Sequence, residues 1–245
     1  MKKLILTIQL VLTLNVITFA QNIFMNGLDS RTQIEIRNPN IQTGHGMYPR
    51  SFFDTIYSFP TPGVFPTGLA WDGLSFWNLD VDSRLIYKLN KSGDIIKSIP
   101  IPAGIGGSDL TWDGNNLWLS DEQSARLLKI DTSSGSVLSS FRLPDSASAD
   151  PNSWGLTWDG TYLWHSQYGP SHRIFKLNPK NGQVISSFDP FSSNVFGIEW
   201  INGFIYGINL VYDTIWNSSI YKFDPSSGMI LDSASWEVPY PLGLI

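Results

Sequence analysis

Residues 155–160 read Gly-Leu-Thr-Trp-Asp-Gly, and closely related segments occupy residues 68–73, 109–114 and 197–203. The four copies follow one another at intervals of about forty residues, a period typical of repeat proteins built from small stacked units. One such unit cannot bury its apolar residues alone, so each copy must pack against its neighbours. The sequence therefore predicts one array of four similar units.

The third copy indicates what each unit looks like. Asp159-Gly160 predicts a hairpin turn, because glycine accepts a positive φ, and the stretch 178–182 predicts a second tight turn around Pro179. Apolar runs of strand length flank both turns. Four short antiparallel strands form one blade of a β-propeller. We therefore expect an all-β fold, a β-propeller with four full four-stranded blades at roughly 68–107, 109–150, 155–195 and 197–240.

The two ends of the repeat region predict a further, split blade. Residues 54–60 resemble a fourth strand with no earlier strands, and residues 241–245 resemble the opening of a fifth copy. Joined, they would form a split partial blade in an incomplete ring of about five to seven blades. Residues 21–53 contain no copy and are expected to be irregular, so the propeller repeats occupy 54–245.

The first twenty residues are typical of a secretory signal peptide. Lys2 and Lys3 precede an apolar stretch that ends at Ala20, a small residue at the expected cleavage position. An uncleaved membrane anchor is the alternative interpretation. We expect a secreted, periplasmic or cell-surface protein with no membrane span after cleavage of the signal.

Composition excludes several classes of function. The chain has 21 acidic and 16 basic residues and a formal net charge of −5, which argues against a nucleic-acid partner. It has no cysteine, so disulfides, thiolate catalysis and Cys-ligated zinc are excluded. Its 10 Trp, 9 Tyr and 14 Phe can form a large core. We expect the repeated aromatic residues to pack between blades, with one tryptophan of each copy largely buried in equivalent places: Trp71, Trp112, Trp158 and Trp200.

The repeats resemble the secreted bacterial propellers of the broad NHL, YWTD and YVTN-like kind, and more weakly the propeller type of glutaminyl cyclotransferase. The second likeness rests on residues 154–160 and 173–179. That family also has a Thr-Gln-Gly-Leu opening with a nearby Glu, whereas this chain has Pro-Thr-Gly-Leu at 66–69. The resemblance implies the propeller fold. It implies an activity only where catalytic residues match, because propellers support both binding and catalysis.

Candidate site residues come from the links that vary between copies and are expected to share one face. Carboxylates there would suit a calcium ion, with ordinary loop acids as the alternative, and no other cofactor is expected. His165 and His172 border one loop and would suit a metal or acid–base chemistry, with two plain loop histidines as the alternative. Glu199 replaces a small residue of the other copies. The metal candidates are Asp80, Asp82, Asp109 and Asp121; the ligand-binding candidates are Trp154, His165, Tyr168, Glu199, Tyr212 and Trp216.

Two functions remain open from the sequence. The aromatic candidates would form stacking platforms, so the first is a recognition propeller that binds an extracellular glycan, peptide or protein through its variable face. The second is an enzyme of glutaminyl cyclotransferase-like or lyase-like type that uses Glu199 or His165. No phosphate loop, nucleophile elbow or zinc-protease motif is present, which favours the binding function.

Overall fold

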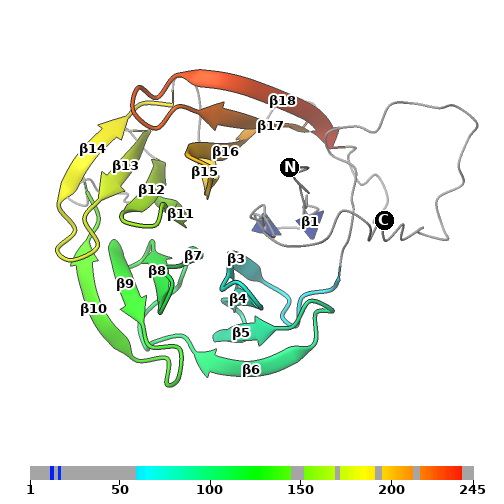
Figure 1. Ribbon diagram of the computed structural model, residues 1–245. Coiled ribbons are helices and arrows are strands. Elements are labelled where there is room, and N and C mark those ends of the chain that lie inside the picture. Colours follow the sequence, from blue (N-terminus) through cyan, green and yellow to red (C-terminus); the bar gives the residue numbers. More distant parts are fainter. Residues whose placement is uncertain are drawn as a thin grey trace, which may run out of the picture.

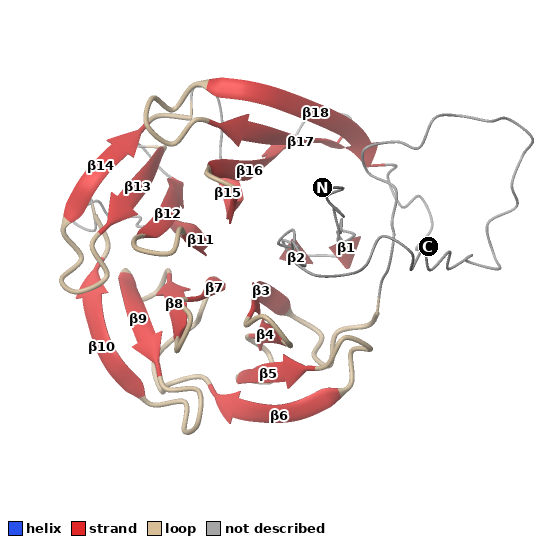
Figure 2. Ribbon diagram, in the orientation of Figure 1, coloured by secondary structure: helices blue, strands red, loops and turns tan. Residues whose placement is uncertain are grey.

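The computed structural model describes residues 12–13, 16–17, 59–144, 152–168, 172–190, 195–211 and 216–238. These residues form strands, turns and loops, and none of them lies in a helix (Figure 2). Accordingly, this part of the chain offers no helical segment with the length and hydropathy needed to cross a bilayer. A two-stranded sheet joins β1 (Leu12–Thr13) to β2 (Val16–Ile17).

The predicted four blades are confirmed. Each is an antiparallel sheet of four consecutive strands, arranged radially so that the first strand lies innermost and the fourth outermost (Figure 1). Blade 1 contains β3 (Pro66–Trp71), β4 (Phe76–Asp80), β5 (Leu85–Leu89) and β6 (Ile95–Pro100). Blade 2 contains β7 (Asp109–Trp112), β8 (Leu117–Asp121), β9 (Arg126–Ile130) and β10 (Val137–Arg142).

The third and fourth blades have the same order of strands. Blade 3 contains β11 (Asn152–Trp158), β12 (Leu163–Tyr168), β13 (Arg173–Leu177) and β14 (Val184–Phe188). Blade 4 contains β15 (Val195–Ile201), β16 (Phe204–Val211), β17 (Trp216–Phe223) and β18 (Ile230–Val238). The inner strands β3, β7, β11 and β15 lie side by side around the axis in that order.

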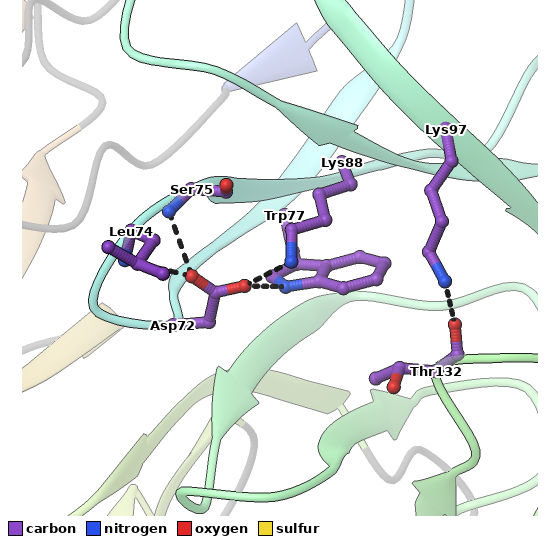
Figure 3. A network of polar contacts seen from close by, with 7 residues as sticks. All are labelled: Asp72, Leu74, Ser75, Trp77, Lys88, Lys97 and Thr132. Atoms are coloured by element: carbon purple, nitrogen blue, oxygen red, sulfur yellow. Dashed lines mark hydrogen bonds and ion pairs between the residues drawn. The ribbon is translucent and has the colours of Figure 1, made fainter.

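The Trp-Asp-Gly part of the repeat builds one polar network per blade. In blade 1, Oδ1 of Asp72 accepts the amides of Leu74 and Ser75 at 2.9 and 2.8 Å. Oδ2 accepts Nε1 of Trp77 at 2.9 Å and pairs with Nζ of Lys88 at 2.7 Å (Figure 3). Burial alone would raise the pKa of Asp72, but these bonds together lower it. The aspartate thus stays ionised and ties the first turn to the second and third strands.

Blades 2 and 3 repeat this network, and blade 4 replaces it. Asp113 and Asp159 bind the tryptophan and lysine of their own blades in the same way. In blade 4, Ile201 stands in place of the aspartate, and Asn202-Gly203 forms a two-residue turn with positive φ at both residues. Lys222 there lies 3.9 Å from the centre of the Phe204 ring. The loss of the carboxylate therefore goes together with a shorter turn and a lysine held by an aromatic ring.

The core lies between blades, but its central tryptophans differ from those predicted. Trp71, Trp112, Trp158 and Trp200 do occupy equivalent register positions, each at the turn end of an inner strand. They are only partly buried. The fully buried rings belong to the second strands: Trp77, Trp118 and Trp164, each 1% exposed.

Aromatic packing between blades is confirmed. Trp164 of blade 3 stacks on Trp200 of blade 4, with ring centres 6.0 Å apart and planes 15° apart. Trp118 of blade 2 belongs to a buried cluster with Leu156 and Leu163 of blade 3. Lys97 also crosses between blades, because its ammonium donates to the carbonyl of Thr132 (Figure 3). Each blade therefore depends on the next for its buried surface.

The two ends of the array do not meet through their inner strands. Within the described residues, the inner strands of consecutive blades contact one another, whereas β3 of blade 1 and β15 of blade 4 have no comparable contact. Phe59 lies against Gly93 of blade 1 as Phe141 lies against Gly182 of blade 3 and Phe188 against Gly228 of blade 4. Phe59 thus has the place of a fourth-strand residue of a preceding blade. The rest of the predicted split blade, and residues 21–53, lie outside the described residues.

Candidate functional site

The inner strands carry two buried acidic groups near the propeller axis, Asp109 on β7 and Glu199 on β15. Each stands where the other blades have an uncharged residue. The position of Asp109 is glycine in blades 1, 3 and 4, and the position of Glu199 is alanine or threonine in the other blades. A buried residue that differs from its counterparts in the internal repeat is expected to be there for function, because functional sites are where the rules of folding are most often broken. We define Asp109, Thr157 and Glu199 as the axial site.

Asp109 joins three consecutive blades. Its Oδ1 accepts the amide of Leu110 at 2.8 Å, its Oδ2 accepts the amide of Leu156 at 2.8 Å, and the amide of Leu69 also donates to it. The residue is 4% exposed. Burial raises the pKa of this carboxyl group well above its usual range and outweighs the three amide bonds, which lower it.

Glu199 is the second carboxyl group of the axial site. Thr157 of blade 3 donates its hydroxyl to Oε2 of Glu199 at 3.3 Å, and the same hydroxyl accepts the amide of Trp200 at 3.0 Å. The residue as a whole is partly exposed, whereas its carboxyl group lies among protein atoms. Burial first, and then the negative charge of Asp109, raise the pKa of Glu199 well above its usual range.

The two carboxyl groups differ in what they can do chemically. Backbone amides donate to both oxygens of Asp109, so this residue is a positioning group. Glu199 keeps partial exposure and a raised pKa, which suits a group that accepts or donates a proton or a hydrogen bond. A pair of neighbouring acids in a desolvated site is typical of a functional centre.

His165 lies on β12 of blade 3 and is 0% exposed. Its Nδ1 lies 3.0 Å from the carbonyl oxygen of Gly155. Because a carbonyl can only accept, Nδ1 carries the proton and Nε2 keeps a free lone pair. Burial lowers the pKa of His165 to about 4, so the ring is neutral at physiological pH. His172, the other end of the predicted pair, is exposed.

The carboxylates predicted to bind calcium are not brought together. In the part of the chain that the structure describes, no three His, Cys, Asp or Glu side chains are placed to hold a metal ion. Asp80 instead accepts the amides of Phe65 and Ser83, and Asp121 accepts those of Gly106, Gly107 and Ser124. Both tie the end of a second strand to its neighbouring loops, and Asp82 is exposed.

The predicted aromatic platform is described in part. Trp154 is partly buried and meets the ring of Phe196 edge to face at 5.0 Å, so it packs against blade 4. The backbone of Tyr168 ends β12 and that of Trp216 begins β17, but their side chains lie outside the described set. Tyr212 lies outside the described residues altogether. The platform therefore stays a prediction.

Two further residues contribute here. The hydroxyl of Thr157 on blade 3 contacts both the carboxyl group of Glu199 and the amide of Trp200 on blade 4. Gln167 takes the place of Asp80 and Asp121 at the end of a second strand and is 4% exposed. The sequence marks Gln167 as a departure, because the first two copies have aspartate at this position. Nothing in the sequence marks Thr157, because Thr111 has the same place in blade 2.

We expect Asp109→Ala to lower the free energy of unfolding by about 1–3 kcal/mol, because three buried amides lose a shared acceptor. A urea titration followed by tryptophan fluorescence measures this change. The exposed Asp82→Ala is the matched control and should change stability by less than about 0.5 kcal/mol. Equal stability of Asp109→Ala and the wild type would show that water or other groups replace the carboxylate at no cost.

No protein-family model matches the chain, and no curated protein matches its sequence. Solved structures do resemble its fold. A glutaminyl cyclase from Myxococcus xanthus is 16% identical with a TM-score of 0.53, over 69% of each chain. A protein of unknown function from Bacteroides caccae is 12% identical with a TM-score of 0.51, over 69% of this chain and 60% of the other. An inactive H270A virginiamycin B lyase from Staphylococcus aureus, whose structure was solved with quinupristin, is 19% identical with a TM-score of 0.49, over 76% of this chain and 59% of the other. At these identities the likeness supports the β-propeller architecture alone.

Proposed function

We propose that this protein is a secreted recognition propeller that binds an extracellular glycan, peptide or protein at the axial site, with Glu199 as the direct contact. The single observation that carries the proposal is the placement of two acidic residues, Asp109 and Glu199, on inner strands of different blades, at positions that are uncharged in the other blades. Ligands of propellers meet the axis or the face around it, and hydroxyl and amide groups of such ligands donate to carboxylates.

The proposal moves the binding centre from the aromatic rim to the axis. Of the aromatic candidates, Trp154 is the one whose side chain is described, and its ring packs against Phe196. Glu199, in contrast, is held by Thr157 and remains partly exposed. Extracellular location is part of the proposal and rests on the signal-like residues 1–20.

Catalysis is the second candidate, and the raised pKa of Glu199 favours it. A carboxyl group whose pKa is raised by burial is suited to general acid chemistry. The propeller fold also occurs in an enzyme, the glutaminyl cyclase described above. Incubation with N-terminal glutaminyl peptides tests this candidate. Product formed by the wild type and lost in Glu199→Gln would establish catalysis in place of simple recognition.

The binding proposal predicts that Glu199→Gln weakens ligand binding at least about tenfold, because one hydrogen bond to an ionisable group contributes about 1.5–3 kcal/mol. Calorimetric titration with panels of oligosaccharides and peptides measures this. Asp82→Asn removes an exposed carboxylate and should bind as the wild type does. A ligand that binds Glu199→Gln and the wild type equally would place the binding site elsewhere.

A further inference from the structure

Three buried polar side chains of blade 3 each keep one atom without a hydrogen-bond partner: Oγ of Ser153, Nε2 of His165 and Oε1 of Gln167. Their residues are 0%, 0% and 4% exposed. Buried polar atoms in native proteins nearly always have a partner, so three together call for an explanation. We refer to them as the inter-blade subsite.

The three side chains share one face of the blade. Ser153 and Gln167 are directly paired across β11 and β12, and His165 precedes Gln167 by two residues on the same strand. Side chains two apart along a strand point to the same side. Leu163, two residues further back, packs with Trp118 of blade 2. The subsite therefore faces the junction between blades 2 and 3.

At the position of His165, blade 1 also has a buried atom without a hydrogen-bond partner, Oδ1 of Asn78, whereas the second strands of blades 1 and 2 end in carboxylates that have partners. Gln167 corresponds to Asp80 and Asp121, whose carboxylate oxygens accept amides of the flanking loops. His165 corresponds to Leu119 of blade 2, an apolar residue at 0% exposure. The fold therefore tolerates an apolar side chain where blade 3 places a free imidazole nitrogen.

The subsite adjoins the axial site. His165 is paired with Leu156 across the two strands, and the amide of Leu156 donates to Asp109 at 2.8 Å. On the opposite side of the junction, the hydroxyl of Ser120 in blade 2 donates to the carbonyl of Trp154 at 3.4 Å. Leu156 thus connects the subsite to the axial site.

The geometry points to a neutral, hydroxyl-bearing ligand, a sugar, whose hydroxyl groups donate to His165 and Gln167 at this subsite. Nε2 of the neutral imidazole and Oε1 of the amide only accept, and the Ser153 hydroxyl can do both. A cation bound there would lose its water without gaining an opposite charge from these three groups, which is unfavourable. An anion would be disfavoured because the free atoms of His165 and Gln167 are hydrogen-bond acceptors. This inference rests on the proposed axial binding function and assigns its ligand to the glycan class.

The test uses neutral mono- and disaccharides with their matched amino sugars and uronic acids, titrated into the full chain by calorimetry. We expect a neutral sugar to bind at least about tenfold more tightly than its charged counterparts. His165→Leu introduces the residue found in blade 2 and removes the acceptor Nε2. Gln167→Met removes the second acceptor, Oε1. Each substitution should weaken sugar binding about tenfold. His165→Asn restores the blade 1 arrangement, in which Asn78 donates to the carbonyl of Gly68, and should keep most of the affinity.

A spectroscopic readout separates direct contact from a structural role. The ¹⁵N resonance of His165 Nε2 should shift when the sugar binds, since its lone pair accepts a new hydrogen bond. An unshifted resonance at saturation, or a crystal structure with sugar bound in which these atoms keep only ordered water, would overturn the inference.

The inference and the proposed function can fail separately. Sugar binding that requires Glu199 but is unchanged in His165→Leu and Gln167→Met would overturn the subsite and leave the axial function standing. If only peptides bind, and their binding requires Glu199, the sugar subsite is overturned and the axial function still stands. Absence of any Glu199-dependent binding would overturn both.

Discussion

Trp164→Ala is expected to lower the free energy of unfolding by about 3–5 kcal/mol, the usual cost of removing a large buried aromatic ring. Trp164 is 1% exposed and stacks on Trp200 of the next blade. Its Nε1 also donates to Asp159 at 2.9 Å, and Lys176 lies 5.0 Å from its ring centre. The substitution therefore opens a cavity between two blades and removes one member of the polar network. Chemical denaturation measured by circular dichroism gives the change.

Trp158→Ala is the matched control, because the same residue type is removed from the same blade at a partly buried place. It should cost about 1–2 kcal/mol, clearly less than Trp164→Ala. The reverse order would mean that the inner strand, and not the second strand, carries the main contact between blades.

Acidification is expected to destabilise the protein by about 3 kcal/mol through His165 alone. The pKa of this residue is lowered from 6.5 to about 4 by burial, so between these values the unfolded chain binds a proton that the folded protein does not. Stability contributed by the neutral ring is complete above pH 6.5 and is lost as the pH falls toward 4. Unfolding free energies from urea titrations between pH 7 and pH 4 measure the loss.

The comparison with His165→Asn isolates this effect. Asp109 and Glu199 have raised pKa values, so their contribution has the opposite sign and falls as the pH rises above their usual values of 3.8 and 4.5. Both carboxyl groups are present in the two proteins, and their contribution largely cancels in the difference. His165→Asn should therefore lose less stability on acidification. Parallel pH profiles would show that folding leaves the pKa of His165 unchanged.

Much of the fold could be predicted from the sequence because the repeat determines it. Asp-Gly turns fixed the first hairpin of three blades, and Gly73, Gly114 and Gly160 all have a φ of 96°. The burial of individual tryptophans could not be predicted, because Trp158 and Trp164 lie in the two strands that flank the same Asp-Gly turn. Their difference depends on distance from the turn and on the aspartate that binds the second ring, which emerges only when the strands pair.

The site was less predictable for a physical reason. Glu199 and His165 could be singled out as departures from the repeat, but their environment depends on contacts between blades. Asp109 was grouped with Asp80 and Asp121 as a metal candidate, since all three are acids near strand ends. Only the assembled inner strands show that its oxygens accept amides from three blades. Interactions that join distant parts of the chain leave no local sequence pattern.

A crystal structure with the tightest-binding sugar or peptide from the titration panels tests the central claim most directly. We expect the ligand at the axial end of the inner strands, with a donor group within hydrogen-bond distance of Glu199 and no density for it in Glu199→Gln crystals prepared in the same way. A ligand seated elsewhere on the blades, with Glu199 untouched and its substitution without effect, would contradict the account.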